Sequence, residues 1–548
     1  MSEEPVPTSP SSSNSPISPN PDSLPPTPPN LHQNTIDPSA RWLVQKFGGT
    51  SVGKFAVKIA EDIVANYIDQ HKVAIVCSAR SGTTKALGTT NLLLRSASQT
   101  LQPPEFNATV DIIRDEHVKA AKASVQDPEL LDELLQEIEY DCDWLRNFLF
   151  AAQIIDEISS RSQDSIVGLG ERLACKIMTA VLRDQGIDAE YVSLEDIVPE
   201  LEDTEASDDV LDQDFYDRLA TAIGERVLQC GPRVPVITGF FGSIPGSLLS
   251  QVGRGYTDLC SALCAVGLNA AELQIWKEVD GIFTADPRKV PTARLLSIIT
   301  PDEAAELTYY GSEVVHPFTM EQAIRRKIPI RIKNVENSRG GGTVIYPDPE
   351  VDAGPEEEIK SENGTVPLET LRRMNSLDEQ KRKRFPTAVT IKEHIIVLNI
   401  NSNRKSVSHG FLAGIFSTLD QYNVVVDLIS TSEVHVSMAI EDGLAKKLLD
   451  RLLKELKKIG TVSMHRDMAI LSLVGKEMRN MVGIAGKMFT TLAQGNVNIE
   501  MISQGASEIN ISCVIQTKDS VKALNLIHQG CLQIMPDGVR GGIGPWLF

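Results

Sequence analysis

The stretch WLVQKFGGTSVGK, residues 42–54, decides the fold of this chain. Its first six residues form an apolar run typical of a β-strand, and two glycines end that run. The following residues, 52–68, carry apolar side chains at helical spacing, and VAIVCSA (73–79) begins a second buried strand. Strand, glycine turn, helix and strand make a βαβ unit, which predicts an α/β fold with a parallel sheet covered by helices.

The length of 548 residues suggests three or four folded units. With 42% apolar and 23% charged residues the composition is that of a globular protein. Asp and Glu number 73 against 53 Lys and Arg, a formal charge of −20, and this disfavours a general nucleic-acid binder, which needs a basic footprint.

The sequence also indicates the cellular setting. No apolar run approaches the length of a membrane span, and the N-terminus lacks the basic and apolar regions of a secretory signal. The eight cysteines form no C-x-x-C pair, and several, such as Cys77, stand in apolar runs. We therefore expect reduced, buried thiols in a cytoplasmic protein. Cys260 and Cys264 could share a helix face and bind metal, but core packing is the favoured interpretation.

Composition divides the chain into five parts. Residues 1–40 hold 11 of the 30 prolines and are predicted to be disordered, because they cannot bury enough apolar surface. A first globular unit is expected over 41–346. Residues 347–388 are polar, acidic and rich in Pro and Gly, contain a KRKR run and are predicted to be a linker. Two further modules are expected over 389–465 and 466–548.

The prediction of the last two modules rests on an internal repeat. FSTLDQYNVVVDLIS, from Phe416, aligns without gaps on FTTLAQGNVNIEMIS, from Phe489. Each copy reads strand, helix, strand, strand, which is part of a ferredoxin-like βαββαβ unit. The duplication predicts two small α+β modules of similar structure.

The first candidate for chemistry is the glycine turn itself. Gly48-x4-Gly53-Lys54 nearly spells a Walker A loop, but Phe55 stands where Ser or Thr would hold Mg²⁺. The alternative places Lys46 near the end of the strand and Gly48–Gly49 in the turn. Backbone N–H groups and the start of the next helix would then face a phosphate, and Lys46 would add a positive charge.

Two other glycine-rich stretches resemble strand-to-helix turns. In GLGERL (168–173), Glu171 is predicted to follow a turn at the start of a helix. In VGRGYTD (252–258), Arg254 lies between glycines and can project into a cleft, where Arg favours bidentate pairing with a carboxylate. Thr257 and Asp258 open the next helix, and Asp258 could hold Mg²⁺ or fix a lysine. A parallel sheet gathers such turns at one edge, which favours a shared site over separate helix caps.

A fourth stretch, WKEVDGIFTADPRKV (276–290), follows another predicted strand. Phe283 could pack on a nucleotide base, and Lys277 or Arg288 could contact phosphate. A hairpin with an exposed basic tip explains the same residues equally well.

Seven motifs in order show a family resemblance: KFGGTSVG, SARSGTTKALGTTNLL, GLGERL, GFFGSIPG, GRGYTDL, WKEVDGIFTADPRKV and YYGSEVVHPFTMEQA. Residues 42–345 resemble the catalytic part of the aspartate kinases, of the monofunctional fungal type, and the repeats resemble ACT regulatory domains. The resemblance implies the amino-acid-kinase fold, an open and mainly parallel eight-stranded sheet between helices, followed by two ferredoxin-like ACT domains. It implies transfer of the ATP γ-phosphoryl group, with Mg²⁺, to the β-carboxylate of L-aspartate.

The resemblance also assigns residues to roles. The catalytic residues would be Lys46, Asp258 and Arg254. Substrate would be bound by Ser78, Thr90, Glu171, Phe240, Arg254 and Thr257, with Arg254 on the α-carboxylate and Glu171 on the α-ammonium group. ATP would be bound by Lys46, Gly48, Gly49, Ser51, Lys277, Glu278, Phe283 and Arg288. No protein metal ligand is assigned beyond a possible Asp258, and no general base is needed, because the attacking carboxylate is ionised at neutral pH.

The ACT resemblance implies feedback control by a free amino acid and assembly into a dimer or dimer-based oligomer. The effector residues would be Ser408, Asp427, Ser432, Glu433, Asn496 and Gln504. The fungal type implies L-threonine as inhibitor, since fungi generally make lysine by another route, although the sequence itself does not distinguish the two. Glu313 stands where several bacterial relatives have a nucleotide-binding Lys, and Gln251 replaces a hydroxyl residue of some relatives.

Four alternatives to this assignment fit the sequence less well. Another amino-acid kinase is disfavoured by Arg254 and Glu171, which suit both ends of an amino acid. An inactive sensor is disfavoured by intact Lys46, Arg254 and Asp258. A fusion to homoserine dehydrogenase and a nicotinamide-dependent dehydrogenase both lack the G-x-G-x-x-G fingerprint.

Overall fold

The computed structural model describes residues 31–81, 87–100, 106–198, 211–242, 244, 247–310, 315–346, 385–402, 410–476, 478–505 and 509–534. The side chains of Gln251 and Arg254 lie outside this description. So do Ser408, Glu313, the KRKR run and all but the last ten residues of the predicted N-terminal tail.

The first unit is built on an eight-stranded sheet in the order β3-β4-β2-β1-β5-β7-β8-β6. All neighbouring strands are parallel except β7 and β8. This confirms the predicted open, mainly parallel sheet, with the strand of the first motif at its centre. The strands are β1 (Trp42–Phe47), β2 (Lys72–Cys77), β3 (Ala189–Val192), β4 (Val234–Thr238), β5 (Glu272–Lys277), β6 (Ile298–Ile299), β7 (Ile330–Asn334) and β8 (Thr343–Ile345).

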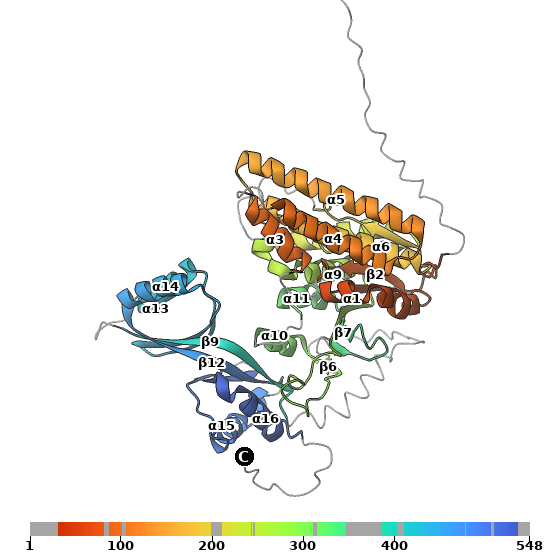
Figure 1. Ribbon diagram of the computed structural model, residues 1–548. Coiled ribbons are helices and arrows are strands. Elements are labelled where there is room, and N and C mark those ends of the chain that lie inside the picture. The colour runs from red at the N-terminus through yellow and green to blue at the C-terminus, as the bar shows by residue number, and fades with distance from the viewer. Residues whose placement is uncertain are drawn as a thin grey trace, which may run out of the picture.

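Helices cover both faces of this sheet (Figure 1). They are α1 (Gly49–Lys58), continued by η1 (Ile59–Val64) and α2 (Ala65–Tyr67), α3 (Thr89–Gln99), α4 (Phe106–Ser124), α5 (Pro128–Ile155), α6 (Ser160–Asp184), α7 (Gln213–Leu228), α8 (Leu248–Gln251), η3 (Gly253–Gly255), α9 (Tyr256–Gly267), α10 (Pro301–Tyr309) and α11 (Pro317–Arg325). None of the described helices is long and apolar enough to cross a membrane.

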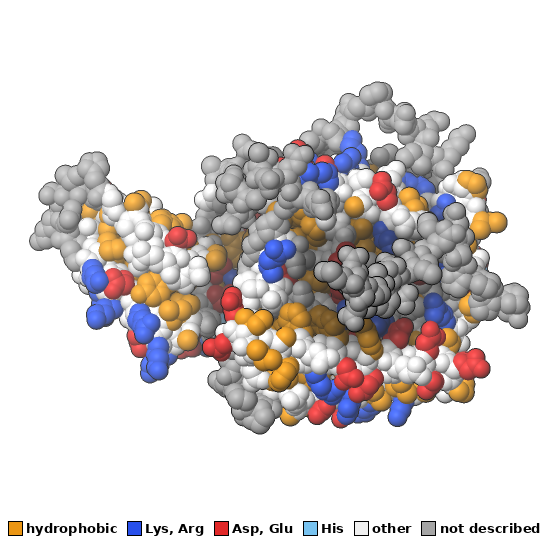
Figure 2. All heavy atoms as spheres, turned by 90° about the horizontal axis from the view of Figure 1, so that it is seen from above, with side chains coloured by type: hydrophobic (Ala, Val, Ile, Leu, Met, Phe, Trp, Pro, Cys, Tyr) orange, Lys and Arg blue, Asp and Glu red, His pale blue; other side chains and the backbone are white. Residues whose placement is uncertain are grey.

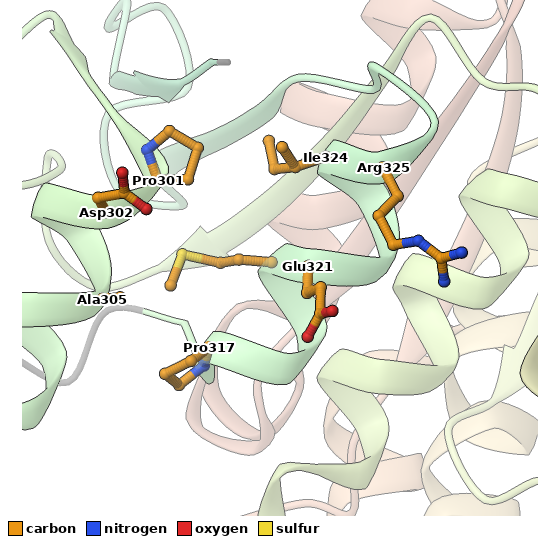
Figure 3. Close-up of a pocket in the computed structure, with 8 residues that line it drawn as sticks. Pro301, Asp302, Ala305, Pro317, Glu321, Ile324 and Arg325 are labelled. Carbon is orange, nitrogen blue, oxygen red and sulfur yellow. The ribbon is translucent and has the colours of Figure 1, made fainter. Parts of the chain in front are cut away.

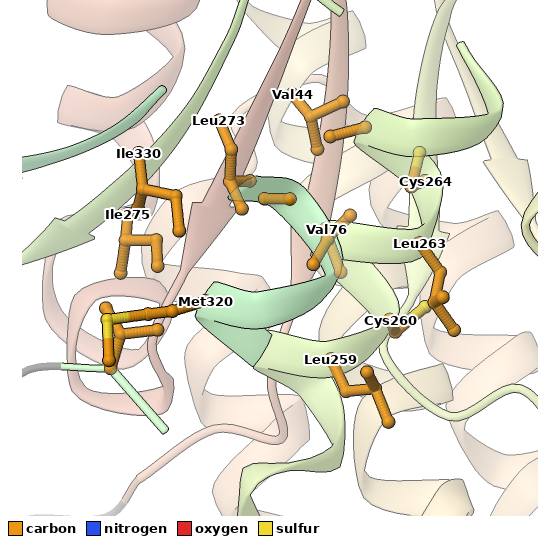
Figure 4. Close-up of a cluster of buried hydrophobic side chains, with 14 of the residues drawn as sticks. Val44, Val76, Leu259, Cys260, Leu263, Cys264, Leu273, Ile275, Met320 and Ile330 are labelled. Atoms are coloured by element: carbon orange, nitrogen blue, oxygen red, sulfur yellow. The ribbon is translucent and has the colours of Figure 1, made fainter. Parts of the chain in front are cut away.

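Alternation along the strands divides the core into two apolar layers. Val44 and Val76 pack with α7, α9 and α11 in one layer, part of which Figure 4 shows. Phe47 and Ile75 pack with α1 and α3 to α6 in the other. All eight cysteines are buried and free of disulfides, as expected for reduced thiols, and Cys260 and Cys264 lie in the first layer among apolar side chains.

The second unit is a six-stranded antiparallel sheet in the order β10-β11-β9-β12-β14-β13. Its elements are β9 (Ala388–Ser402), α13 (Phe411–Gln421), β10 (Val426–Thr431), β11 (His435–Glu441), α14 (Lys446–Ile459), β12 (Gly460–Val474), η4 (Met478–Asn480), α15 (Ile484–Gln494), β13 (Met501–Ser503), β14 (Asn510–Gln516), η5 (Thr517–Asp519) and α16 (Ser520–Gly530). Both repeats thus form the expected strand, helix, strand, strand pattern.

The two long strands join the repeats into one sheet. The second half of β9 pairs with the first half of β12, and Ala388–Lys392 pairs with Ile470–Val474. The predicted division between 465 and 466 falls inside β12, beside the register shift between His465 and Met468. Strand β9 therefore contributes to both halves of the sheet.

Helix α10 connects the two units (Figure 1). The Glu303 carboxylate accepts hydrogen bonds from the Thr387 hydroxyl (2.6 Å) and the Lys476 N–H (2.8 Å). The Thr390 hydroxyl donates to the Tyr310 carbonyl (2.8 Å). On the face shown in Figure 2, Lys and Arg side chains are interspersed with Asp and Glu, without a continuous basic tract among the described residues.

Candidate functional site

The glycine turn lies directly after β1, with Gly48 as N-cap of α1 and no side chain capping the helix. The Ser81 N–H donates to the Gly49 carbonyl (2.9 Å), so the turn packs on the segment that follows β2. A Cβ on Gly49 would lie 2.2 Å from the Ala79 carbonyl oxygen, whereas a Cβ on Gly48 would meet nothing within 4 Å. Gly49 is thus required by packing, and Gly48 borders open space at the start of a helix, where an anion is favoured.

These two glycines give a matched pair of variants. Gly49→Ala should lower Tm and activity together, because the backbone of Ala79 would have to move away from the new methyl group. Gly48→Ala should keep Tm, since its φ of −70° suits alanine, and should raise the KM for ATP if phosphate fills the open space. Thermal unfolding and ATP titrations check both. Equal effects of the two substitutions on Tm would contradict this assignment.

An ion pair stands beside the turn. The Lys46 Nζ lies 2.7 Å from Asp258 Oδ1, and the two side chains are 10% and 17% exposed. Lys46 belongs to central strand β1 and Asp258 to the first turn of α9. Burial would raise the pKa of Asp258, but Lys46 and Lys277, with a smaller effect of His316, outweigh burial and hold that pKa below its usual value. The site therefore keeps an ionised carboxylate against a buried lysine.

His316 is a member of this cluster that the sequence interpretation missed. It is the N-cap of α11, and its side chain approaches Gly255, whose Cβ would lie 3.6 Å from the His316 Cβ. The only sequence signal was the His-Pro pair, since Pro in the first helical turn marks a helix start.

Glu171 is a correction to the sequence interpretation. GLGERL does not form a turn at a helix start but lies in the middle of α6. A Cβ on Gly168 would lie 2.4 Å from the Phe240 ring, and one on Gly170 would lie 2.9 Å from the Ala79 Cβ. The glycines therefore allow close packing of α6, which a local turn signal cannot reveal.

The surroundings of Glu171 nevertheless suit its predicted role. It is 1% exposed and accepts a hydrogen bond from the Thr257 hydroxyl (2.5 Å). Its other oxygen, Oε2, has no hydrogen-bond partner among the described residues. Burial raises the pKa of Glu171 to about 8, against the opposing effects of hydrogen bonds from Thr257, Tyr256 and the Ala79 backbone and of the charge of Lys46. A cationic group would satisfy the remaining oxygen and favour the ionised form.

The other predicted substrate residues lie at the same edge of the sheet. Ser78 directly follows β2, and Thr90 is in the first turn of α3; both side chains are partly buried. Phe240 follows β4, is 3% exposed and meets Tyr256 edge to face at 6.4 Å. The backbone of Arg254 lies in η3, between α8 and α9.

Only some of the residues predicted to bind ATP lie close to the Lys46–Asp258 pair. The Ser51 hydroxyl, in α1, donates to Glu278 Oε1 (2.7 Å), which links the glycine turn to the end of β5, where Lys277 also lies. Phe283 forms an isolated bridge with Leu295. Arg288 is paired with Asp286, and its side chain is 89% exposed. The structure thus brings Ser51, Lys277 and Glu278 to the cluster, whereas Arg288 points to solvent, as in the alternative interpretation.

The predicted effector residues lie in the second unit. Asp427 in β10 is paired with Lys392 (2.7 Å) and is 14% exposed, and its Oδ2 has no hydrogen-bond partner among the described residues. Ser432 and Glu433 are exposed between β10 and β11. Asn496 and Gln504 are exposed around β13. Their role in binding an effector remains a prediction.

A cavity of about 290 Å³ lies between α10 and α11 (Figure 3). Pro301, Ala305, Met320 and Ile324 contribute its apolar lining, and Asp302, Glu321 and Arg325 stand at its border. None of the predicted site residues lines it.

Comparisons with known proteins identify the family of the chain. Residues 41–334 match the amino acid kinase family and residues 471–530 an ACT domain. The chain is 54% identical to an aspartokinase of Schizosaccharomyces pombe over 91% of this chain and 94% of that protein. It is 51% identical to an aspartokinase of Saccharomyces cerevisiae over 89% and 92%.

Two solved structures of a bacterial aspartokinase are also similar to this chain. Aspartokinase III of Escherichia coli in complex with aspartate and ADP matches with a TM-score of 0.65 and 26% identity over 89% of this chain and 99% of that one. The complex of that enzyme with lysine and aspartate matches with a TM-score of 0.69 and 27% identity over the same shares.

Proposed function

Because the chain belongs to the amino acid kinase family and, within it, to the aspartokinases, we propose that it transfers the γ-phosphoryl group of ATP to the β-carboxylate of L-aspartate. The products would be 4-phospho-L-aspartate and ADP, the first step toward threonine, methionine and isoleucine. The observation that carries the proposal is the buried Lys46–Asp258 pair beside the glycine turn, with Glu171 bound to Thr257 next to it.

This geometry suits phosphoryl transfer to a carboxylate. Both reactants are anionic, so the protein must offset their repulsion and align them. Lys46 provides a positive charge at the end of the central strand, and Asp258 fixes its position. The β-carboxylate of aspartate is ionised at neutral pH, so no general base has to remove a proton from it. The two acidic side chains of the site are accordingly paired with other groups, Asp258 with Lys46 and Glu171 with Thr257.

The two ends of aspartate would be recognised separately. Glu171 offers a buried oxygen without a partner among the described residues, which suits the α-ammonium group. Arg254, on the short helical turn before α9, would pair with the α-carboxylate. Together they would place the β-carboxylate toward Lys46.

Magnesium would enter with the nucleotide. Among the described residues no three His, Cys, Asp or Glu side chains gather in a way that could hold a metal ion, and Asp258 is already paired with Lys46. These residues would suit an ion bound chiefly by ATP phosphates, and Asp258 would be the protein carboxylate available to it. When bound, the ion would neutralise part of the phosphate charge.

A substrate series tests this function. ADP release should depend on L-aspartate, should fall strongly with L-glutamate, which is one methylene longer, and should be lost with N-acetyl-L-aspartate, which has no ammonium group for Glu171. Turnover of N-acetyl-L-aspartate at a rate near that of L-aspartate would contradict the role of Glu171. Turnover of glutamate alone would contradict the substrate.

We expect the second unit to bind an inhibitory amino acid, with L-threonine as the first candidate from the resemblance to fungal enzymes. An effector acts only through its different affinities for the active and inactive states. The ammonium group of the effector would have to share the Asp427 carboxylate with Lys392, which is paired with one of its two oxygens. Assembly into a dimer through the ACT domains and a cytoplasmic location also remain predictions.

Asp427→Asn should raise the threonine concentration for half-inhibition about tenfold, because one charge-assisted hydrogen bond is lost. Asp420→Asn, on the exposed side of α13, is the matched control and should leave inhibition unchanged. Assays of ADP release with threonine and with lysine measure both. Inhibition by lysine alone would reject threonine, and insensitivity of the unsubstituted enzyme to both would leave the repeats as assembly modules.

A further inference from the structure

Helix α6 carries a second buried carboxylate that the catalytic assignment does not use. Asp164 is 1% exposed and stands two turns before Glu171 on the same helix. Burying an ionised group requires hydrogen bonds or an opposite charge. The partners of Asp164 therefore indicate what it does.

Three donors converge on this carboxylate. Oδ1 accepts from the Ser247 hydroxyl (2.9 Å) and from the Leu249 N–H (3.2 Å). Oδ2 accepts from the Leu248 N–H (2.6 Å). These N–H groups belong to the first turn of α8, so Asp164 caps that short helix from a distant part of the chain.

The chain enters α8 through an unfavourable backbone conformation. Ser247 has a φ of +94°, which residues other than glycine rarely adopt. Such a conformation persists only where the surroundings impose it. The Asp164 hydrogen bonds to Ser247 and to the next two N–H groups help to hold this entry, together with the bond from the Ser247 N–H to the Ile244 carbonyl (3.3 Å).

The segment that begins there ends at the active site. From Leu248 the chain runs through α8 and η3, which contains Arg254, into α9. At its other end Thr257 donates to Glu171. Segment 248–257 is therefore fixed at both ends by carboxylates of one helix.

We propose that Asp164 is a positioning residue for the aspartate site, which sets the turn that presents Arg254 to the α-carboxylate of the substrate. This inference rests on the proposed function, since it assumes that Arg254 binds that carboxylate. Asp164 itself would not touch the substrate. It would act through the hydrogen bonds to α8, while Glu171 fixes the other end of the segment.

The test compares Asp164→Asn with the unsubstituted enzyme. Asparagine keeps the size of the side chain but replaces one acceptor oxygen by an NH₂ group. This group donates, so it cannot accept the hydrogen bonds from Leu248 or from Ser247 and Leu249 that the oxygen accepted. The KM for aspartate should rise about tenfold, the effect of one hydrogen bond to a charged group, while kcat and the KM for ATP change less than about twofold. Ser247→Ala, which removes one of the three bonds, should produce a smaller rise.

Asp127→Asn is the matched control. Asp127 also caps a helix, accepting from the N–H groups of Glu129 and Leu130 at the start of α5, but it is exposed and lies on no segment that carries a site residue. It should leave the KM for aspartate unchanged and change Tm little, because Asn caps a helix about as well as Asp. If Asp164→Asn behaves in the same way, Asp164 is merely structural and the inference is wrong.

A double substitution decides whether Asp164 acts through Arg254. In an Arg254→Ala enzyme the additional change Asp164→Asn should leave the KM for aspartate almost unchanged, because the guanidinium that it positions is absent. If the double variant instead shows the product of the two single-variant increases in the KM for aspartate, the inference is wrong. Absence of aspartate turnover in the unsubstituted enzyme would instead contradict the proposed function, so the two failures are distinguishable.

Discussion

Lys46→Met is expected to lower kcat about a thousandfold, the upper range for removing one preorganised electrostatic group from an active site. The methionine keeps most of the side-chain volume but removes the charge that faces Asp258 at 2.7 Å. The loss should appear in kcat more than in either KM, because repulsion between the reacting groups is greatest in the transition state. Single-turnover measurements with saturating ATP and aspartate provide the test.

The same substitution leaves Asp258 largely buried without its nearest cation. Loss of that charge should raise the pKa of Asp258 and lower Tm, although Lys277 and His316 remain nearby. Lys46→Met with Asp258→Asn should recover Tm but not kcat. Lys58→Met is the control, since Lys58 lies at the end of α1 and donates to the Glu336 carbonyl at the surface. Retention of more than about a tenth of kcat in Lys46→Met would contradict the role of Lys46.

Glu171→Gln is expected to raise the KM for aspartate between about tenfold and a hundredfold, because a charge-assisted hydrogen bond to the α-ammonium group is replaced by a neutral one. The amide keeps an acceptor for the Thr257 hydroxyl, so the fold should persist. Glu137→Gln on α5 is the control, since burial raises the pKa of Glu137 as well but it lies outside the site. An unchanged KM in Glu171→Gln would show that the ammonium group is bound elsewhere.

The pH dependence of the same residue gives a second measurement. The pKa of Glu171 is about 8, so kcat/KM for aspartate should rise with pH up to that value and then level off, and Glu171→Gln should abolish the rise. The free energy of unfolding should instead fall as pH rises. Between the ordinary pKa of 4.5 and about 8 the folded state keeps a proton that the unfolded state has released, so stability falls as pH rises through this window. Glu171→Gln should remove that part of the decline, which thermal unfolding at several pH values can measure.

The parts of the fold that were predictable from the sequence are those determined by local pattern. The apolar run before Gly48, the helical spacing after it and the strand ending at Cys77 fix the βαβ unit at the centre of the sheet. The 73-residue offset between Phe416 and Phe489 fixed the second unit in the same way. Thr257 and Asp258 were also placed correctly, because a glycine turn before a helix is a local signal.

The remaining features depend on contacts between residues distant in sequence. Gly168 and Gly170 signalled a turn, yet they are small because α6 packs on Phe240 and Ala79. Asp164 gave no signal, because its partners at Ser247 and Leu248 become neighbours only in the folded chain. The Lys392–Asp427 pair likewise needs the sheet to be assembled before its two residues meet.

The most direct test of the account identifies the group that accepts the phosphate. The purified enzyme with Mg-ATP and L-aspartate is assayed for ADP in the presence of hydroxylamine, which converts an acyl phosphate to a hydroxamate. Formation of the β-hydroxamate of aspartate in equal amount with ADP, and loss of both in Lys46→Met, is the predicted result. ADP release that does not depend on aspartate, or that yields no hydroxamate, would contradict phosphorylation of the β-carboxylate.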